Sequence, residues 1–165
     1  GFSPTSLRFS TVYGLSRRMR FDLTVNEFTK DLALGKELVI FGEQFWRPYC
    51  HVRDFSNAFI TVLNSPIEKV SYNVFNVGDT KENYTKQMLV NEIKKVLPNS
   101  KIKYVVKNDD PRDYRVNCDK IKKELGFEIS MKVVDGIMEI KRAIKENLIQ
   151  DSEDQKYYNI PHERK

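Results

Sequence analysis

The sequence contains few of the residues and motifs that signal a metal site or a complete catalytic centre. Only two cysteines and two histidines occur among 165 residues, and Cys50 and Cys118 lack the spacing of metal ligands. No glycine-rich loop follows a strand and opens a helix, so the dinucleotide-binding fingerprint is absent. A nucleophile elbow and a phosphate-binding P-loop are absent too. We therefore expect no metal site in this chain.

Long apolar runs and blocks of like charge are also missing. No apolar run approaches the roughly 18 residues of a membrane-spanning helix, and no signal peptide is visible, so we expect no membrane partner. The net charge of +5 is mild and falls on short lysine and arginine clusters, which argues against a nucleic-acid partner. Two thiols without metal-ligand spacing suit a reducing, cytoplasmic location.

The hydrophobic pattern alternates between strands and helices, which indicates an α/β fold. It predicts strands over residues 7–13, 37–42, 49–52, 72–77 and 101–106. It predicts a helix capped by Asp22 that runs to about Leu34, one capped by Asp54 that runs over Leu63 and one capped by Thr85 that runs to Leu97. It predicts two more helices, over residues 119–125 and over about 133–148. Residues 1–150 form one region. We expect residues 151–165, which are polar, to form a poorly ordered tail.

Two parts of the sequence carry arginines suited to one anion. Arg112 and Arg115 lie in a turn-like segment before the short helix that stops at Gly126, and Arg47 lies far upstream in the loop over residues 43–48. A guanidinium is a permanently charged planar fork that can bind phosphate through two hydrogen bonds. Two separated arginines that converge on one ligand indicate a diphosphate.

Five motifs occur in order and carry a family resemblance. They are LRFSTVYG (7–14), GKELVIFG (35–42), WRPYCHVRD (46–54), FNVG (75–78) and DKIKKELGF (119–127). Together they resemble the C-terminal half of an extended short-chain dehydrogenase/reductase of the NAD-dependent nucleotide-sugar epimerase/dehydratase family. The resemblance covers residues 6–148. It implies the last strands of a Rossmann-like sheet and a mostly helical substrate lobe.

The resemblance also implies what this chain lacks. In that family a glycine-rich NAD loop and a Tyr-x-x-x-Lys catalytic pair precede the first of these motifs, and neither occurs here. We therefore expect no catalytic residue in this chain, most of the NAD site outside it, and no activity of the fragment alone. Since strand 7–13 follows the first residues directly, we expect the chain to begin in the middle of a larger protein.

The family places diphosphate-binding arginines at positions that match Arg47 and the Arg112/Arg115 segment. For Arg47 the alternative is a surface arginine stacked on Trp46. The spacing around Arg112 and Arg115 leaves the choice between them open, with Arg115 favoured because it lies closer to the helix. The alternative for Arg115 is an ion pair with Asp113 or Asp119.

The resemblance implies further contacts with the ligands. Val39 and Phe41 alternate on one face of a strand that flanks the nucleotide base, with core packing as the alternative. Thr11 matches a position near the sugar phosphate, Phe9 a position near the nicotinamide, and Arg20 precedes the helix that covers the substrate. In the WRPYCHVRD motif we expect a helix cap from its final aspartate and a hydrogen-bonded structural role for its histidine.

The leading hypothesis is therefore the substrate-binding part of an NAD-dependent nucleotide-sugar epimerase or dehydratase. The alternative is a stand-alone, non-catalytic module that binds nucleotides or polyanions. Strands 7–13 and 72–77 would be neighbours of parallel strands that are missing from this chain, and exposed strand edges recruit partners. We therefore expect a homo-oligomer or an unusually apolar exposed surface.

Overall fold

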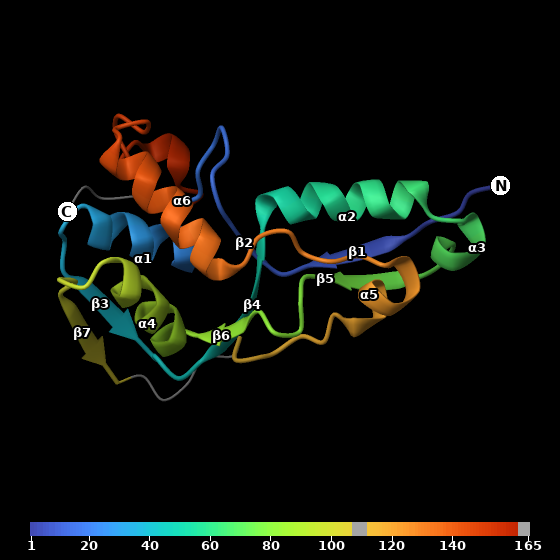
Figure 1. Cartoon of the computed structure of the whole chain (residues 1–165), viewed down its shortest axis with the longest axis horizontal. Helices are drawn as coiled ribbons and strands as arrows, with labels where there is room; N and C mark the ends of the chain where they lie inside the picture. The colour runs from blue at the N-terminus through green and yellow to red at the C-terminus, as the bar shows by residue number, and fades with distance from the viewer. Residues whose placement is uncertain (107–111, 162–165) are drawn as a thin grey trace.

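The computed structural model describes residues 1–106 and 112–161 and has a mixed α/β fold (Figure 1). The predicted fold class is confirmed. The strands are β1 (Ser6–Phe9), β2 (Thr11–Tyr13), β3 (Leu38–Phe41), β4 (Trp46–His51), β5 (Val74–Val77), β6 (Asn83–Thr85) and β7 (Ile102–Val105). The helices are α1 (Thr24–Ala33), α2 (Val52–Asn64), α3 (Ile67–Val70), α4 (Lys86–Val96), α5 (Asp119–Leu125), α6 (Val133–Lys145) and the 3₁₀ helix η1 (Gln155–Tyr157).

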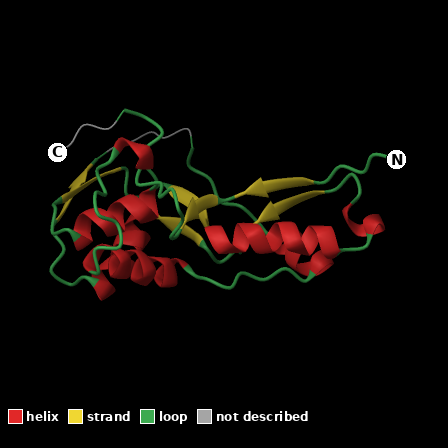
Figure 2. Ribbon diagram, turned by 90° about the horizontal axis from the view of Figure 1, so that it is seen from above, coloured by secondary structure: helices red, strands yellow, loops and turns green. Residues whose placement is uncertain are grey.

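The molecule has a narrow arm and a broader lobe (Figures 1 and 2). The arm holds β1, β5, α2, α3 and α5, with the N-terminus at its tip. The lobe holds α1, α4 and α6 with β3 and β7 at its outer edge. Strands β2, β4 and β6 join the two parts. Residues predicted to bind ligand are consequently distributed over the arm, the junction and the lobe.

The described strands form three small sheets. β1 pairs with β5 in parallel, β2 pairs with β4 in parallel and β4 with β6 antiparallel, and β3 pairs with β7 in parallel. The strand predicted over 7–13 is wrong as one unit, because Ser10 interrupts it. The Ser10 amide and hydroxyl both donate to the carbonyl of Val77, and the chain then passes from the β5 partner to the β4 partner.

Three apolar clusters stabilise these parts. The lobe core lies between α1, α4, α6 and the strands β2, β3 and β4, and the arm core lies between α2, α5 and the β1–β5 pair. A third cluster joins residues 15–21 to α6 and to residues 149–158. The large buried side chains of these clusters include Tyr13, Leu89 and Ile137 in the lobe, Phe75 and Ile121 in the arm, and Phe21 and Tyr158 in the third cluster. Each cluster removes apolar area from water, the dominant favourable contribution to folding.

Two predicted helix caps are wrong and one is confirmed. α1 begins at Thr24 without a side-chain cap, and α2 is capped by His51, whose Nδ1 accepts from the Arg53 amide. Asp54 lies inside the first turn of α2 and binds another segment. Thr85 caps α4 as predicted, since its hydroxyl accepts from the Met88 amide at 3.1 Å.

The C-terminal segment (residues 151–161) is packed against α1, which corrects the prediction of a poorly ordered tail. Its described residues form η1, and Tyr158 and Ser152 are buried. The Phe21 amide donates to the carbonyl of Tyr157 at 3.1 Å. The remainder of the predicted tail, residues 162–165, lies outside the described residues. Over the two described ranges, none of the helices has the length and apolar character needed to cross a membrane.

Candidate functional site

The arginine segment lies beside the beginning of β4. The Trp46 amide donates to Asp113 Oδ1 at 2.7 Å, and the Tyr114 amide donates to the carbonyl of Trp46 at 3.3 Å. Arg47 lies on β4, whereas the sequence predicted that it lies in a loop. The two predicted arginine positions are brought together by main-chain contacts between segments more than 60 residues apart.

Two cation–π contacts join β4 to the arginine segment. The Arg47 guanidinium carbon lies 5.5 Å from the centre of the Tyr114 ring, and that of Arg115 lies 4.9 Å from the Trp46 ring. Arg115, not Arg47, is thus the arginine over Trp46. Arg47 Nη1 also donates to the Trp46 carbonyl at 2.6 Å. Stacking on an aromatic face restrains a guanidinium while its N–H edges stay directed outward. We call Trp46, Arg47, Tyr114 and Arg115 the arginine–aromatic cluster.

Two polar side chains that the sequence reasoning missed hold this segment in place. Asn83 donates to the Val116 carbonyl at 3.0 Å and accepts from the Val116 amide at 2.9 Å. Thr80 accepts from the Cys118 amide at 2.9 Å. The acidic partners proposed for Arg115 are engaged elsewhere, because Asp113 binds the Trp46 amide and Asp119 accepts from Thr80. Buried amide side chains of this kind are visible in sequence only as polar residues within an apolar pattern.

A cavity of about 700 Å³ lies between α1, β3 and the C-terminal segment. All four residues of β3 line it, but Val39 and Phe41 are 41% and 51% exposed, whereas Leu38 and Ile40 are buried in the core. The alternative of ordinary core packing is therefore wrong for Val39 and Phe41. The strand alternation predicted for this segment is confirmed.

The other predicted positions lie apart from this cavity. Phe9 lines a second hollow of about 440 Å³ together with Arg115, and its ring also packs 4.4 Å from Phe55. Arg112 is exposed at the beginning of the arginine segment. Thr11 is half-buried on β2, beside β4. The structure thus gives two neighbourhoods, one around β3 and one around the arginine–aromatic cluster.

Arg20 is engaged within its own turn. Its Nε and Nη2 donate to the two carboxylate oxygens of Asp22 at 2.7 and 2.8 Å. These hydrogen bonds hold the pKa of Asp22 below its usual value, against the opposing effect of burial. The planar fork of Arg20 is therefore already occupied by a carboxylate.

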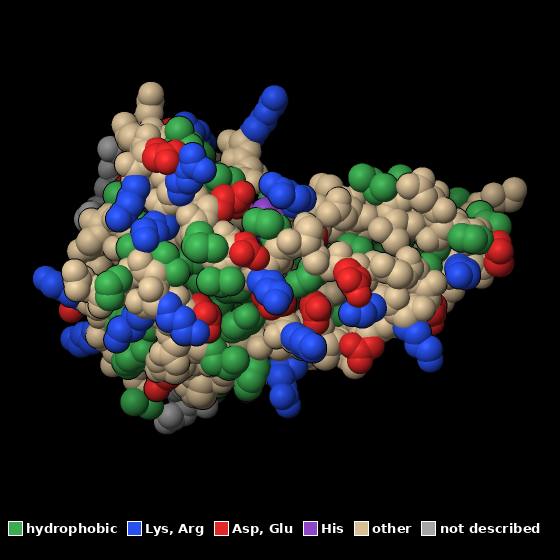
Figure 3. Space-filling view, in the orientation of Figure 1, with side chains coloured by type: hydrophobic (Ala, Val, Ile, Leu, Met, Phe, Trp, Pro, Cys, Tyr) green, Lys and Arg blue, Asp and Glu red, His purple; other side chains and the backbone are tan. Residues whose placement is uncertain are grey.

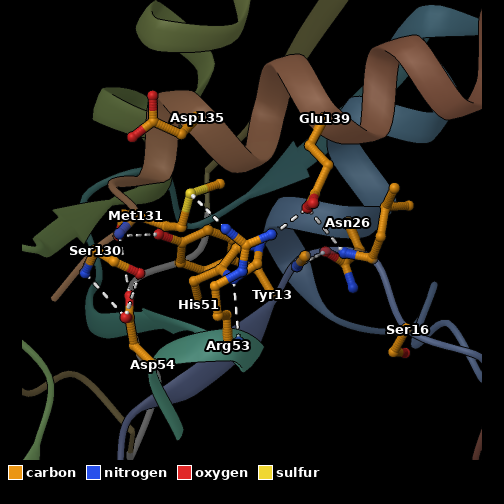
Figure 4. Close-up of polar contacts among 12 residues, drawn as sticks. Tyr13, Ser16, Asn26, His51, Arg53, Asp54, Ser130, Met131, Asp135 and Glu139 are labelled. Atoms are coloured by element: carbon orange, nitrogen blue, oxygen red, sulfur yellow. Dashed lines mark hydrogen bonds and ion pairs between the residues drawn. The ribbon is translucent and has the colours of Figure 1, made fainter. Parts of the chain in front are cut away.

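A buried polar network joins β2, β4 and α2 to α6 and the segment before it (Figure 4). His51 Nδ1 accepts from the Arg53 amide at 3.1 Å, and its Nε2 lies 2.9 Å from Glu139 Oε2. The same oxygen of Glu139 accepts from the Leu15 amide at 3.0 Å. Both ring nitrogens of His51 are engaged, so its predicted hydrogen-bonded character is confirmed.

Asp54 forms a second part of this network. Its carboxylate accepts from the amide of Ser130 at 2.9 Å, the hydroxyl of Ser130 at 2.7 Å and the amide of Met131 at 3.1 Å. Asp54 thereby joins α2 to the segment before α6. Across residues 1–106 and 112–161, no group of three or more metal-ligating side chains is gathered.

Comparison with known proteins gives a family match over the first part of the chain. Residues 1–78 match the model of the NAD dependent epimerase/dehydratase family. The resemblance predicted from the sequence is confirmed. NAD, predicted as the cofactor of this family, agrees with the family's own description.

Solved structures of epimerases share the fold. The UDP-glucose 4-epimerase of Thermotoga maritima, solved with UDP-glucose, is 24% identical with a TM-score of 0.71, over 86% of this chain and 46% of that one. The UDP-glucuronic acid 4-epimerase of Bacillus cereus, solved with UDP-glucuronic acid and NAD, is 22% identical with a TM-score of 0.71, over 85% and 44%. An epimerase of Methanothermobacter thermautotrophicus is 18% identical with a TM-score of 0.75, over 91% and 46%. The chain spans a little less than half the length of these epimerases.

Proposed function

We propose that this chain is the substrate-binding portion of an NAD-dependent nucleotide-sugar epimerase or dehydratase. In this role it holds the nucleotide diphosphate while NAD oxidises the sugar. The observation that carries the proposal is the arginine–aromatic cluster, in which Arg47 and Arg115 come from segments far apart in sequence and lie over Tyr114 and Trp46. Two restrained guanidinium groups suit a doubly charged diphosphate better than a single anion.

The physical task of such a site is positioning. Hydride transfer requires the sugar carbon to be held against the nicotinamide, and fixing the reactants supplies much of the rate acceleration. A diphosphate is a useful handle because it is charged and distant from the reacting carbon, so binding energy gained there can orient the sugar. Arg47 and Arg115 would form this handle, with Arg112 as a further contact on the same segment.

The cavity beside β3 is proposed to receive the nucleotide base. Val39 and Phe41 present apolar surface to it near the end of β3. Thr11 is proposed to lie near the sugar phosphate. Arg20 is a weaker substrate contact because Asp22 occupies it.

NAD, when bound, would supply the hydride acceptor. Phe9 is the residue of this chain proposed to contact the nicotinamide, and two observations fit that role. Phe9 lies at the carboxyl end of β1 in a parallel pair, where ligands of α/β sheets bind, and it lines the hollow that Arg115 also lines. We propose that the chain alone is inactive, that its location is cytoplasmic and that it forms homo-oligomers.

Calorimetric titration tests the proposal directly. The chain is titrated with UDP, with TDP and with uridine, each at matched ionic strength. We expect a nucleoside diphosphate to bind and uridine to bind far more weakly, because uridine lacks the charge that the arginines recognise. Equal affinity for UDP and uridine would contradict a diphosphate site. Reduction of NAD by this chain in the presence of UDP-glucose would contradict its proposed inactivity.

A further inference from the structure

The C-terminal segment docks on α1 through a buried lysine. Lys30 is 2% exposed, and its ammonium group donates to Glu153 Oε1 at 3.0 Å and to the Tyr158 hydroxyl at 2.9 Å. It also pairs with Asp31 at 3.0 Å. A buried ammonium group is costly unless it is paired and hydrogen-bonded. Two of the partners that satisfy Lys30 come from the C-terminal segment, so the docking of this segment and the burial of Lys30 depend on each other.

The same groups face the cavity beside β3. Lys30, Glu153 and Tyr158 line it together with Val39 and Phe41. Glu153 Oε1 accepts a second hydrogen bond, from Lys36 Nζ at 2.8 Å, and Lys36 also lines the cavity. One carboxylate therefore bridges two lysines on α1 and the turn after it. The cavity wall is made by two parts of the chain that lie 123 positions apart at the Lys30–Glu153 contact.

A second set of contacts fixes the segment independently of Lys30. The Arg18 side chain donates to the carbonyl of Lys156 at 2.7 Å and to Asn159 Oδ1 at 2.8 Å. The Asn159 amide donates to Asp22 at 3.2 Å. The segment is thereby attached both to α1 and to the loop before it. Contacts at several points along the segment give it a defined shape, which is what selective binding of a rigid ligand requires.

We infer that the C-terminal segment is a positioning element of the nucleotide pocket. Glu153 and Tyr158, held by Lys30, shape the wall against which the nucleotide base rests. The inference rests on the proposed function. It assigns the segment to the base rather than to the diphosphate, because the cavity is lined by Val39 and Phe41, whereas Arg115 lines the other hollow.

Two variants of the full chain test the inference by titration with UDP. Glu153→Gln removes the charge that bridges Lys30 and Lys36, and Tyr158→Phe removes only the hydroxyl that Lys30 donates to. We expect each to weaken UDP binding roughly five- to tenfold. Glu146→Gln is the matched control, since Glu146 is an exposed glutamate that pairs with Arg142 at the end of α6. Its affinity for UDP should equal that of the wild type.

Hydrogen exchange separates a wall of the pocket from a purely structural attachment. If the segment contacts the bound base, UDP slows exchange of the amides over residues 152–158 in the wild type. Unchanged UDP affinity in both variants, or no ligand-dependent protection of the segment, overturns the inference and leaves the proposed function standing. Failure of the wild-type chain to bind UDP overturns the proposed function and the inference with it. If Glu153→Gln does not fold, Tyr158→Phe decides.

Discussion

At the scale of single residues, the geometry of Arg47 and Arg115 matters as much as their charge. Each guanidinium lies over an aromatic ring, and Arg47 is further tied to the Trp46 carbonyl. Lysine would keep the charge at either position but lose both the planar fork and the stacking. The arginine–aromatic cluster therefore allows charge and geometry to be tested separately.

Replacing Arg47 by lysine should weaken UDP binding. We expect Arg47→Lys to bind UDP roughly tenfold more weakly, because one bidentate charge-assisted contact is lost while the net charge is unchanged. Titration calorimetry at fixed ionic strength measures the change. Arg142→Lys is the control, since Arg142 is exposed on α6 and pairs with Glu146. Equal UDP affinity in the two variants would remove Arg47 from the site.

Glu82 gives a pH-dependent prediction. It is buried, its Oε2 accepts from the Val133 amide at 2.9 Å, and burial raises the pKa of Glu82 despite that hydrogen bond. A carboxyl whose folded pKa lies above its unfolded pKa stabilises the fold fully below the unfolded value. That contribution declines as the pH rises through the folded pKa.

Glu82→Gln should consequently gain stability relative to the wild type as the pH rises. Glutamine keeps an acceptor oxygen for the Val133 amide and carries no charge to bury. Urea unfolding at pH 4.5 and pH 7.5 gives the difference in free energy of unfolding at each pH. The exposed Glu124→Gln variant on α5 should show no comparable change. If the difference between Glu82→Gln and the wild type is the same at both pH values, the buried charge of Glu82 has no role.

At the scale of elements, Gly136 allows α6 to pack closely on β2. A β-carbon at Gly136 would lie 2.4 Å from Cε2 of the Tyr13 ring, closer than carbon atoms approach without a shift. Gly136→Ala gains helix propensity of about 1 kcal/mol but must displace a buried ring, which costs roughly 2–3 kcal/mol. We therefore expect a net loss of stability of about 1–2 kcal/mol.

Chemical denaturation of Gly136→Ala measures this loss. Met138→Ala on the same helix is the control, since Met138 is exposed and its replacement should change the free energy of unfolding by less than about 0.5 kcal/mol. Equal stability of Gly136→Ala and the wild type would mean that α6 moves away from Tyr13 without cost.

The elements also show which parts of the fold are predictable from sequence. α5 and the Thr85 cap of α4 agree with prediction because their signals are local: a helical repeat ended by Gly126 in the left-handed region, and a hydroxyl three residues before the amide it caps. The division of strand 7–13 and the strand character of Arg47 depend on partners elsewhere in the chain. Local patterns do not contain that information.

The candidate site also has parts that are predictable from sequence and parts that are not. Pairing of Arg47 with the arginine segment is predictable, because the motifs around both imply one ligand. The contacts of Lys30 with Glu153 and Tyr158 are not predictable. The residues after Gln150 are polar, as in a disordered tail, and give no sign of a buried lysine 123 positions upstream. Burial of Asn83 under the arginine segment is hidden for the same reason.

At the scale of the whole molecule, basic and apolar side chains are distributed differently over the surface. On the face seen in Figure 3, lysine and arginine are scattered among acidic and apolar side chains. The arm, in contrast, exposes large apolar residues from α2 onward: Phe59, Leu63, Ile67 and Tyr72, with Leu63 82% exposed. Parallel sheets are normally covered on both faces, yet β1 and β5 form an isolated pair.

We therefore predict self-association of this chain through the arm. Burying these side chains in a second copy removes apolar area from water at roughly 25 cal/mol per Å², which favours a dimer as the concentration rises. Analytical ultracentrifugation over a range of concentrations should show the mass increase with concentration. The double variant Leu63→Glu with Ile67→Glu should remain monomeric, because association would then bury unpaired carboxylates. Met138→Glu, at an exposed position on α6, is the control and should associate like the wild type. A wild-type chain that stays monomeric at all concentrations would show that the arm needs no partner.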